Sequence, residues 1–155
     1  TALRDLVARD DIAALVCYLS ELVAARMRKS GVKAKGIYIG VRSTELVRES
    51  RQRVLPEAVH SSTDISDACM ALLDTFHDGK PLRSLDVGVF ALSPADAPRQ
   101  LSFFDDSGHA RNEALDKAID KLRLKYGKRS VLRACLLEQD IYTDKDVGDF
   151  LPFKR

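Results

Sequence analysis

Two stretches of the chain repeat apolar residues at the spacing of one helix face. Residues 12 to 29 place apolar side chains three or four positions apart, and the acidic pair Asp10 and Asp11 stands ahead of them. We expect this pair to cap a helix that stops at Gly31. Residues 65 to 76 have the same spacing and follow a cluster of capping residue types at 61 to 64. The pattern predicts two amphipathic helices.

Three other stretches alternate apolar and polar residues with the period of a β-strand. Residues 36 to 42 place Ile37, Ile39 and Val41 on one side, so this strand is predicted to be half buried. Residues 47 to 55 are expected to be its hairpin partner, and residues 85 to 91 alternate in the same way. The predicted order is helix, strand, strand, helix, strand.

One more strand at the start would complete a split β-α-β-β-α-β arrangement, and residues 2 to 6 are a plausible remnant of it. The predicted fold class is therefore α+β, with the first strand truncated, two helices on one sheet face and the other face open. Since Thr1 is not an initiator, we expect the chain to be cut from a longer protein.

The remaining segments predict a C-terminal appendage. Residues 112 to 126 carry Leu115, Ile119, Leu122 and Tyr126 on one helical seam, residues 130 to 137 are predicted to add a strand, and residues 140 to 155 have no assignment. The predicted units are a sheet domain at 1 to 95, a linker at 96 to 108 and a helix with a tail at 109 to 155.

Charge is distributed unevenly along the chain. The net charge is only +2, but the segment from Arg26 to Arg53 holds nine basic residues against two acidic ones. Such asymmetry favours a polyanionic partner, although a solvated face is the simpler interpretation of a charge cluster alone.

Candidate catalytic residues are scarce. The three cysteines and three histidines are scattered without metal-ligand spacing, so neither a zinc site nor a hydrolase is supported. There is no signal peptide and no apolar run of membrane-spanning length, which predicts a cytoplasmic protein without a membrane partner.

The segment from Gln100 to Phe104 stands out because it lies between a proline-rich break and a new helix. Its apolar residues have no obvious core of their own, so a partner protein could bury them. The alternative is that Phe103 and Phe104 fold back onto the same chain.

Several segments, taken in order, resemble the little-finger (polymerase-associated) domain and C-terminal tail of Y-family translesion DNA polymerases, the UmuC/DinB or ImpB/MucB/SamB group. The similar segments are residues 3 to 5 with the helix at 12 to 29, residues 50 to 56, 63 to 65, 79 to 87, 100 to 104, 118 to 123 and 125 to 127. The resemblance covers roughly residues 1 to 137. It implies a little-finger fold and a role in DNA repair, translesion synthesis and the SOS response.

The resemblance also implies a binding role for particular residues. Two strands would follow the phosphate backbone of duplex primer-template DNA, one through Ser50, Arg51 and Arg53 and the other through Lys80, Arg83 and Ser84. Arg42 and Tyr38 would extend this surface, and we expect Arg51 and Arg53 to project together from the open face. Asp86 stands where the family commonly has glycine, and Gly88 occupies a position that can be basic, so the last strand is expected to hold DNA less firmly.

Gln100, Leu101, Ser102, Phe103 and Phe104 resemble the peptide with which the family binds the bacterial sliding clamp. No catalytic residue and no cofactor are expected in this chain, because the family's magnesium-binding carboxylates belong to another domain of the parent polymerase. Two alternatives remain. One is an RNA-binding module, for which only Tyr38 offers an exposed aromatic ring, and the other is a non-catalytic interaction module with the peptide and third helix folded onto its own sheet.

Overall fold

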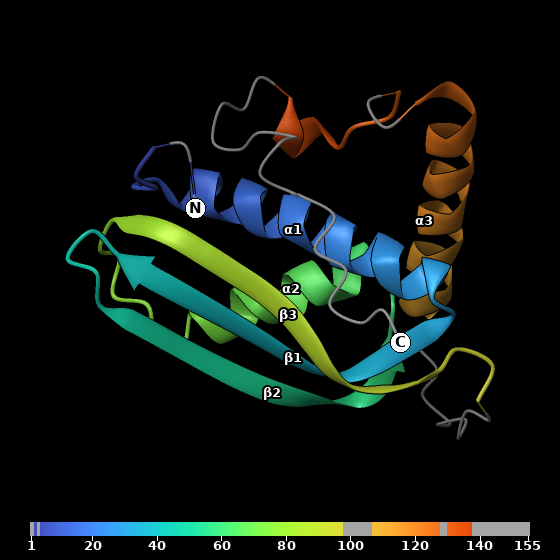
Figure 1. Cartoon of the computed structure of the whole chain (residues 1–155), viewed down its shortest axis with the longest axis horizontal. Helices are drawn as coiled ribbons and strands as arrows, with labels where there is room; N and C mark the ends of the chain where they lie inside the picture. The colour runs from blue at the N-terminus through green and yellow to red at the C-terminus, as the bar shows by residue number, and fades with distance from the viewer. Residues whose placement is uncertain (1, 3, 98–106, 128–129, 138–155) are drawn as a thin grey trace, which may run out of the picture.

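The computed structural model describes residues 2, 4–97, 107–127 and 130–137. The elements are α1 (Arg9–Lys29), β1 (Val32–Ser43), β2 (Arg48–Val59), α2 (Ser62–Leu73), β3 (Leu82–Pro94), α3 (Ser107–Tyr126) and a 3₁₀ turn, η1 (Ala134–Leu136). The strands form one antiparallel sheet in the order β2-β1-β3, with α1 and α2 beside it (Figure 1). The predicted α+β class and the predicted element order are confirmed.

The start of the chain joins the sheet through one isolated bridge. Leu6 forms an isolated antiparallel bridge with Leu82 at the beginning of β3, and their backbone N–H and C=O groups are joined in both directions at 2.7 and 2.9 Å. Leu6 is completely buried. The predicted first strand is therefore reduced to a single bridge among the described residues.

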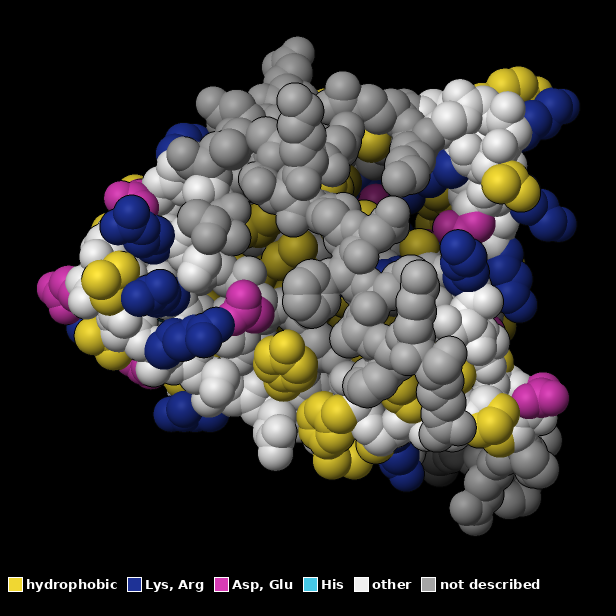
Figure 2. Space-filling view, viewed as in Figure 1, with side chains coloured by type: hydrophobic (Ala, Val, Ile, Leu, Met, Phe, Trp, Pro, Cys, Tyr) yellow, Lys and Arg dark blue, Asp and Glu magenta, His cyan; other side chains and the backbone are white. Residues whose placement is uncertain are grey.

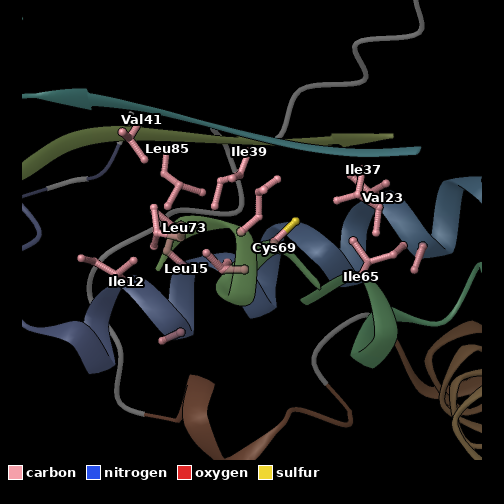
Figure 3. Packing of buried hydrophobic residues seen from close by; sticks show 14 of the residues in the cluster. Ile12, Leu15, Val23, Ile37, Ile39, Val41, Ile65, Cys69, Leu73 and Leu85 are labelled. Atoms are coloured by element: carbon pink, nitrogen blue, oxygen red, sulfur yellow. The ribbon is translucent and has the colours of Figure 1, made fainter. Parts of the chain in front are cut away.

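The core lies between the inner face of the sheet and the two helices. Ile37, Ile39 and Val41 of β1 are buried, as their alternation predicts, and Figure 3 shows them with Leu85 directed toward the helices. Burying one such side chain contributes about 1.5–3 kcal/mol. The facing helix residues are Ile12, Leu15 and Val23 of α1 and Ile65, Cys69 and Leu73 of α2.

The helix ends differ from the prediction in three ways. Asp10 and Asp11 lie inside the first turn of α1 rather than capping it, and there their charges suit the positive end of the helix dipole. The residue before α2, Ser61, makes no side-chain cap bond. Helix α2 also ends at Leu73, three residues before Phe76.

The cap of α2 comes from α3 instead. Asp116 is 3% exposed, and its Oδ2 accepts the backbone N–H of Ser62, the first residue of α2, at 2.6 Å. Its other oxygen accepts the Ser62 hydroxyl at 2.9 Å. A carboxylate at this position satisfies free N–H groups and stabilises the helix dipole.

Helix α3 contacts the rest of the domain through charged side chains. Arg28 of α1 donates to Asp116 at 3.0 Å and to both oxygens of Asp120 at 2.6 and 2.9 Å. Lys33 donates to Glu113 at 2.8 Å. The predicted apolar seam lies largely outside this contact, because Leu115, Leu122 and Tyr126 are 49%, 42% and 63% exposed.

The strand predicted at residues 130 to 137 is wrong. Residues 134–136 form η1, and Leu136 is buried in the same core as α1 and α2. Arg133, just before η1, donates to Glu21 of α1 at 2.8 Å and to Ser62 of α2 at 2.7 Å. Hydrogen bonds from this arginine, and not strand pairing, hold the segment in place.

Candidate nucleic-acid interface

The register of the sheet decides which candidate residues share a face. Residues directly opposite each other in an antiparallel pair point to the same side. Arg42 lies opposite Arg48 of β2 and Ser84 of β3, and Gly40 lies opposite Ser50. These even-numbered positions of β1 alternate with the buried odd-numbered ones. Arg42, Arg48, Ser50 and Ser84 therefore lie together on the open face.

Arg51 and Arg53 do not lie on that face, contrary to the prediction. They stand opposite Ile39 and Ile37, so both point to the helix side of the sheet. The Arg51 guanidinium lies over the ring of Phe76, 5.2 Å from its centroid. Both arginines are nevertheless exposed, since β2 is an edge strand whose residues 48–54 are exposed on both sides.

The physical reason for this error is the composition of β2. A period of two identifies which residues share a side, but it identifies the inner side only where one set is apolar. Residues 48 to 53 are all polar or charged, so nothing in the segment indicates its orientation. The arginines occupy the edge of the sheet and not its open surface.

The arginines differ in their existing contacts. Arg48 reaches over the central strand to Asp86 of β3, with Nη2 and Oδ2 2.9 Å apart. By contrast, the side chains of Arg42 and Arg53 have no ion pair or hydrogen bond within the described part of the chain. Figure 2 shows Lys and Arg side chains gathered at the left, at the hairpin end of the sheet. This end offers cations that an anionic partner could neutralise.

Lys80 and Arg83 lie at the same end, where β3 begins. Both are exposed, and Lys80 forms an ion pair with Asp78 at 2.8 Å, which raises the pKa of the Lys80 ammonium through a side-chain hydrogen bond. Arg83 lies at a register shift between β1 and β3, where its carbonyl accepts the N–H of Ala2 at 3.3 Å. Both predicted residues are therefore near Ser84, within the same corner of the sheet.

Two aromatic rings cover glycines farther along the open face. A Cβ atom on Gly88 would lie 2.0 Å from the ring of Tyr38, and one on Gly36 would lie 2.3 Å from the ring of Phe90. These pairs face each other across β1 and β3. Each ring thus lies against the backbone of the neighbouring strand, in space that a larger residue would fill.

The sequence interpretation considered Tyr38 alone and missed Phe90. The alternation of residues 85 to 91 could have identified Phe90. It places Phe90 and Gly88 on the side of the strand opposite Leu85, Val87 and Val89. With both rings on one face, the surface has a basic end at Arg42 and Arg48 and an aromatic end at Tyr38 and Phe90.

Other predicted features fall outside this surface or outside the described residues. The peptide Gln100 to Phe104 lies outside the described ranges. Within those ranges, no group of three or more His, Cys, Asp or Glu side chains is placed to hold a metal ion. None of the helices in the described part is long and apolar enough to cross a bilayer.

Comparison with known proteins places the chain in a family. Residues 1–103 match the model of the impB/mucB/samB family C-terminal domain. The chain is 30% identical over 136 residues to DNA polymerase IV of Clostridium acetobutylicum, covering 88% of this chain and 34% of that protein. It is 32% identical over 140 residues to DNA polymerase IV of Acetivibrio thermocellus, covering 89% of this chain and 35% of that protein.

A third relative, DNA polymerase IV 2 of Bacillus subtilis, is 32% identical over 130 residues, which are 82% of this chain and 31% of the relative. The chain thus spans about a third of the length of these curated relatives. The family match and the little-finger-like arrangement of helices and sheet agree with each other. The chain belongs to the impB/mucB/samB family and carries the C-terminal domain of its Y-family DNA polymerases.

Proposed function

We propose that this chain holds duplex DNA by its phosphate backbone as part of a lesion-bypass DNA polymerase. The observation that carries the proposal is the exposed run of β2 from residue 48 to 54, with arginines on both of its sides. The family relationship supports it, since the relatives named above are DNA polymerases.

The geometry of an edge strand suits a repeating anion. Alternate residues lie about 7 Å apart along a strand, comparable with the separation of successive phosphates in one DNA strand. Arg51 and Arg53 are spaced in this way, and arginine can pair two phosphate oxygens through its planar fork. The outer edge of β2 also has backbone N–H groups that β1 does not engage.

Arg42 and Arg53 are the strongest candidates for phosphate contacts. They reach the DNA without first breaking an internal ion pair, whereas Arg48 must leave Asp86. Asp86 also places a negative charge on the open face, so we propose that β2 and the hairpin end contribute more to binding than the middle of β3.

Binding of this kind is expected to tolerate any base sequence and to weaken with salt. Titration of the chain with a fluorescent duplex between about 50 and 200 mM salt tests this, because each neutralised phosphate contributes about 0.9 to the slope of log K against log salt. A linear slope of several units is expected for duplexes of unrelated sequence. Affinity that is independent of salt, or that is confined to one sequence, would contradict the proposal.

We further propose that Gln100 to Phe104 tethers the polymerase to a bacterial sliding clamp. Leu101 and Phe104 are the residues expected to enter the clamp pocket, while Gln100 bonds at its edge. A weak tether suffices, because it raises the effective concentration of the polymerase at the primer end. The magnesium-dependent chemistry of the polymerase is proposed to reside outside this sequence.

Titration with purified clamp tests the tether separately. Gln100→Ala and Phe104→Ala are each expected to weaken binding strongly, while Ser102→Ala is the matched control within the same peptide. Equal binding by all four proteins, or no binding by any, would contradict the tether without affecting the DNA proposal.

A further inference from the structure

Two cysteines far apart in sequence meet at the surface of α1. Cys17 lies on α1 and Cys135 lies in η1, and the Cys135 thiol approaches the Cys17 sulfur at 3.7 Å. Both are free thiols, and Cys17 is half-buried while Cys135 is exposed. The third cysteine, Cys69, is completely buried in the core.

Small molecules can reach this pair through a groove. The groove runs between α1, α2 and η1, and both cysteines line it together with Asp67, Met70 and Arg133. Apolar side chains such as Met70 and charged ones such as Asp67 both line it, and a small uncharged oxidant can enter it. Cys69 lacks such access, because its side chain is enclosed on all sides.

We propose that Cys17 and Cys135 form a peroxide-responsive disulfide that fastens the C-terminal segment to α1. In the first step, the Cys135 thiolate attacks hydrogen peroxide, an S–O bond forms as the O–O bond breaks, and the departing hydroxide takes up a proton to give water. In the second step, the Cys17 sulfur attacks the Cys135 sulfenic acid, the S–S bond replaces the S–O bond, and the departing hydroxide takes up the Cys17 thiol proton and leaves as a second water. Together the two thiols lose two electrons, and these reduce the peroxide to two waters.

The order of the two cysteines follows from their surroundings. Burial, together with the neighbouring Cys135, raises the pKa of the Cys17 thiol to about 12, although Arg133 opposes the rise. Cys17 is therefore a poor first nucleophile toward peroxide. Its position beside Cys135 suits the resolving role, since the sulfur it must attack is already in contact.

A disulfide at Cys135 would also stabilise the ion pairs of the nearby Arg133. Arg133 stands two residues before Cys135 and contacts Glu21 of α1 at 2.8 Å and Asp116 of α3 at 3.3 Å. Arg123 of α3 joins the same Glu21 at 3.0 Å. These contacts are noncovalent and can open when the segment locally unfolds, whereas a covalent link stays closed. Oxidation would hold η1 in place, and with it the residues that retain α3.

Peptide mass spectrometry of the peroxide-treated chain tests the bond. We expect an intramolecular Cys17–Cys135 link in the wild-type chain, reversed by dithiothreitol, with Cys69 unmodified. Cys135→Ser should abolish oxidation by one equivalent of peroxide, whereas Cys17→Ser should leave a trappable sulfenic acid on Cys135. Absence of the link, a link only between separate molecules, or equal modification of Cys69 would overturn the proposal.

A second measurement tests the fastening and needs no DNA. Limited proteolysis should cut the region of α3 and η1 more slowly in the oxidised chain than in the reduced chain, because the covalent link prevents η1 from detaching. Cys69→Ser should retain the difference, and Cys17→Ser should lose it. Equal cutting of the oxidised and reduced wild-type chains would overturn the fastening role.

Discussion

The backbone N–H of Ser62 donates to Oδ2 of Asp116 at 2.6 Å, so that a residue of α3 caps the first turn of α2. The same carboxylate accepts Arg28 at 3.0 Å, and the side chains of Arg28 and Asp116 are only 10% and 4% exposed. One buried charge thereby connects three helices. This carboxylate therefore attaches α3 to both α1 and α2.

Asp116→Ala should release α3. Asp116→Ala removes the acceptor of the Ser62 N–H and one of the partners of Arg28, and leaving a buried donor without its acceptor costs about 1–3 kcal/mol. We expect the amides of α3 to lose most of their hydrogen-exchange protection, while those of β1 keep theirs. The matched control is Lys121→Ala, an exposed position on the same helix, which should change protection by less than about 0.5 kcal/mol. Retained protection of α3 in Asp116→Ala would contradict the assignment.

The aromatic and glycine pairs predict an asymmetric response to alanine. Gly88→Ala should destabilise the domain by about 1–3 kcal/mol, because its Cβ would lie 2.0 Å from the ring of Tyr38 and the ring must move. Gly40→Ala is the matched control on the same face, since the nearest atom would be 3.4 Å away. Urea unfolding measures both. A cost for Gly88→Ala that persists in a Tyr38→Ala background would show that the ring is not the cause.

The contact of His60 with α3 predicts a dependence of stability on pH. Burial lowers the pKa of His60 from its ordinary value of 6.5, outweighing Glu113, which raises it; Lys33, Arg28 and Lys117 also lower it. The unfolded chain therefore binds a proton at His60 more readily than the folded chain does. Its contribution is fully present above pH 6.5 and is lost as pH falls toward the lower folded value.

We expect the free energy of unfolding to fall below pH 6.5 and His60→Gln to flatten this part of the profile. The contribution of Glu113 to stability is also lost as the pH falls, below the ordinary pKa of 4.5. Burial raises the pKa of Glu113, but Lys33 and His60 outweigh burial and lower it. Asp67 changes the stability in the opposite direction, because burial raises its pKa and the folded chain therefore binds the proton more readily. Urea titrations at several pH values provide the measurement. Parallel profiles for the wild type and His60→Gln would contradict the role of His60.

The helices and the inner face of the sheet were predictable because their apolar residues follow simple periods. Ile37, Ile39 and Val41 had to face the helices, and the helix at residues 12 to 29 appears as α1 almost unchanged. The docking of α3 was not predictable in this way. The side of α3 that contacts the domain carries Asp116, Glu113 and Asp120, and the partners of these charges come from distant segments.

The candidate surface was predictable in its residues and only partly in its arrangement. The inner side of β1 is unambiguous, because one set of its alternate residues is apolar. The register with β2 and β3 then places Arg42, Ser50 and Ser84 on the open face. The orientation of β2 was not readable, since its residues 48 to 53 lack an apolar set, and Arg51 and Arg53 fall on the other side. The pairing of Phe90 with Gly36 required the register of strands that are distant in sequence.

Duplex binding by the Arg42→Ala/Arg53→Ala chain tests the proposed DNA grip most directly. The matched control is Arg111→Ala/Lys121→Ala, which removes the same charge from exposed positions on α3. The sheet variant should bind about tenfold more weakly, with a salt slope reduced by about two, while the control keeps the wild-type slope. If both variants lose affinity equally, or if the sheet variant keeps the wild-type slope, these arginines do not contact the phosphate backbone.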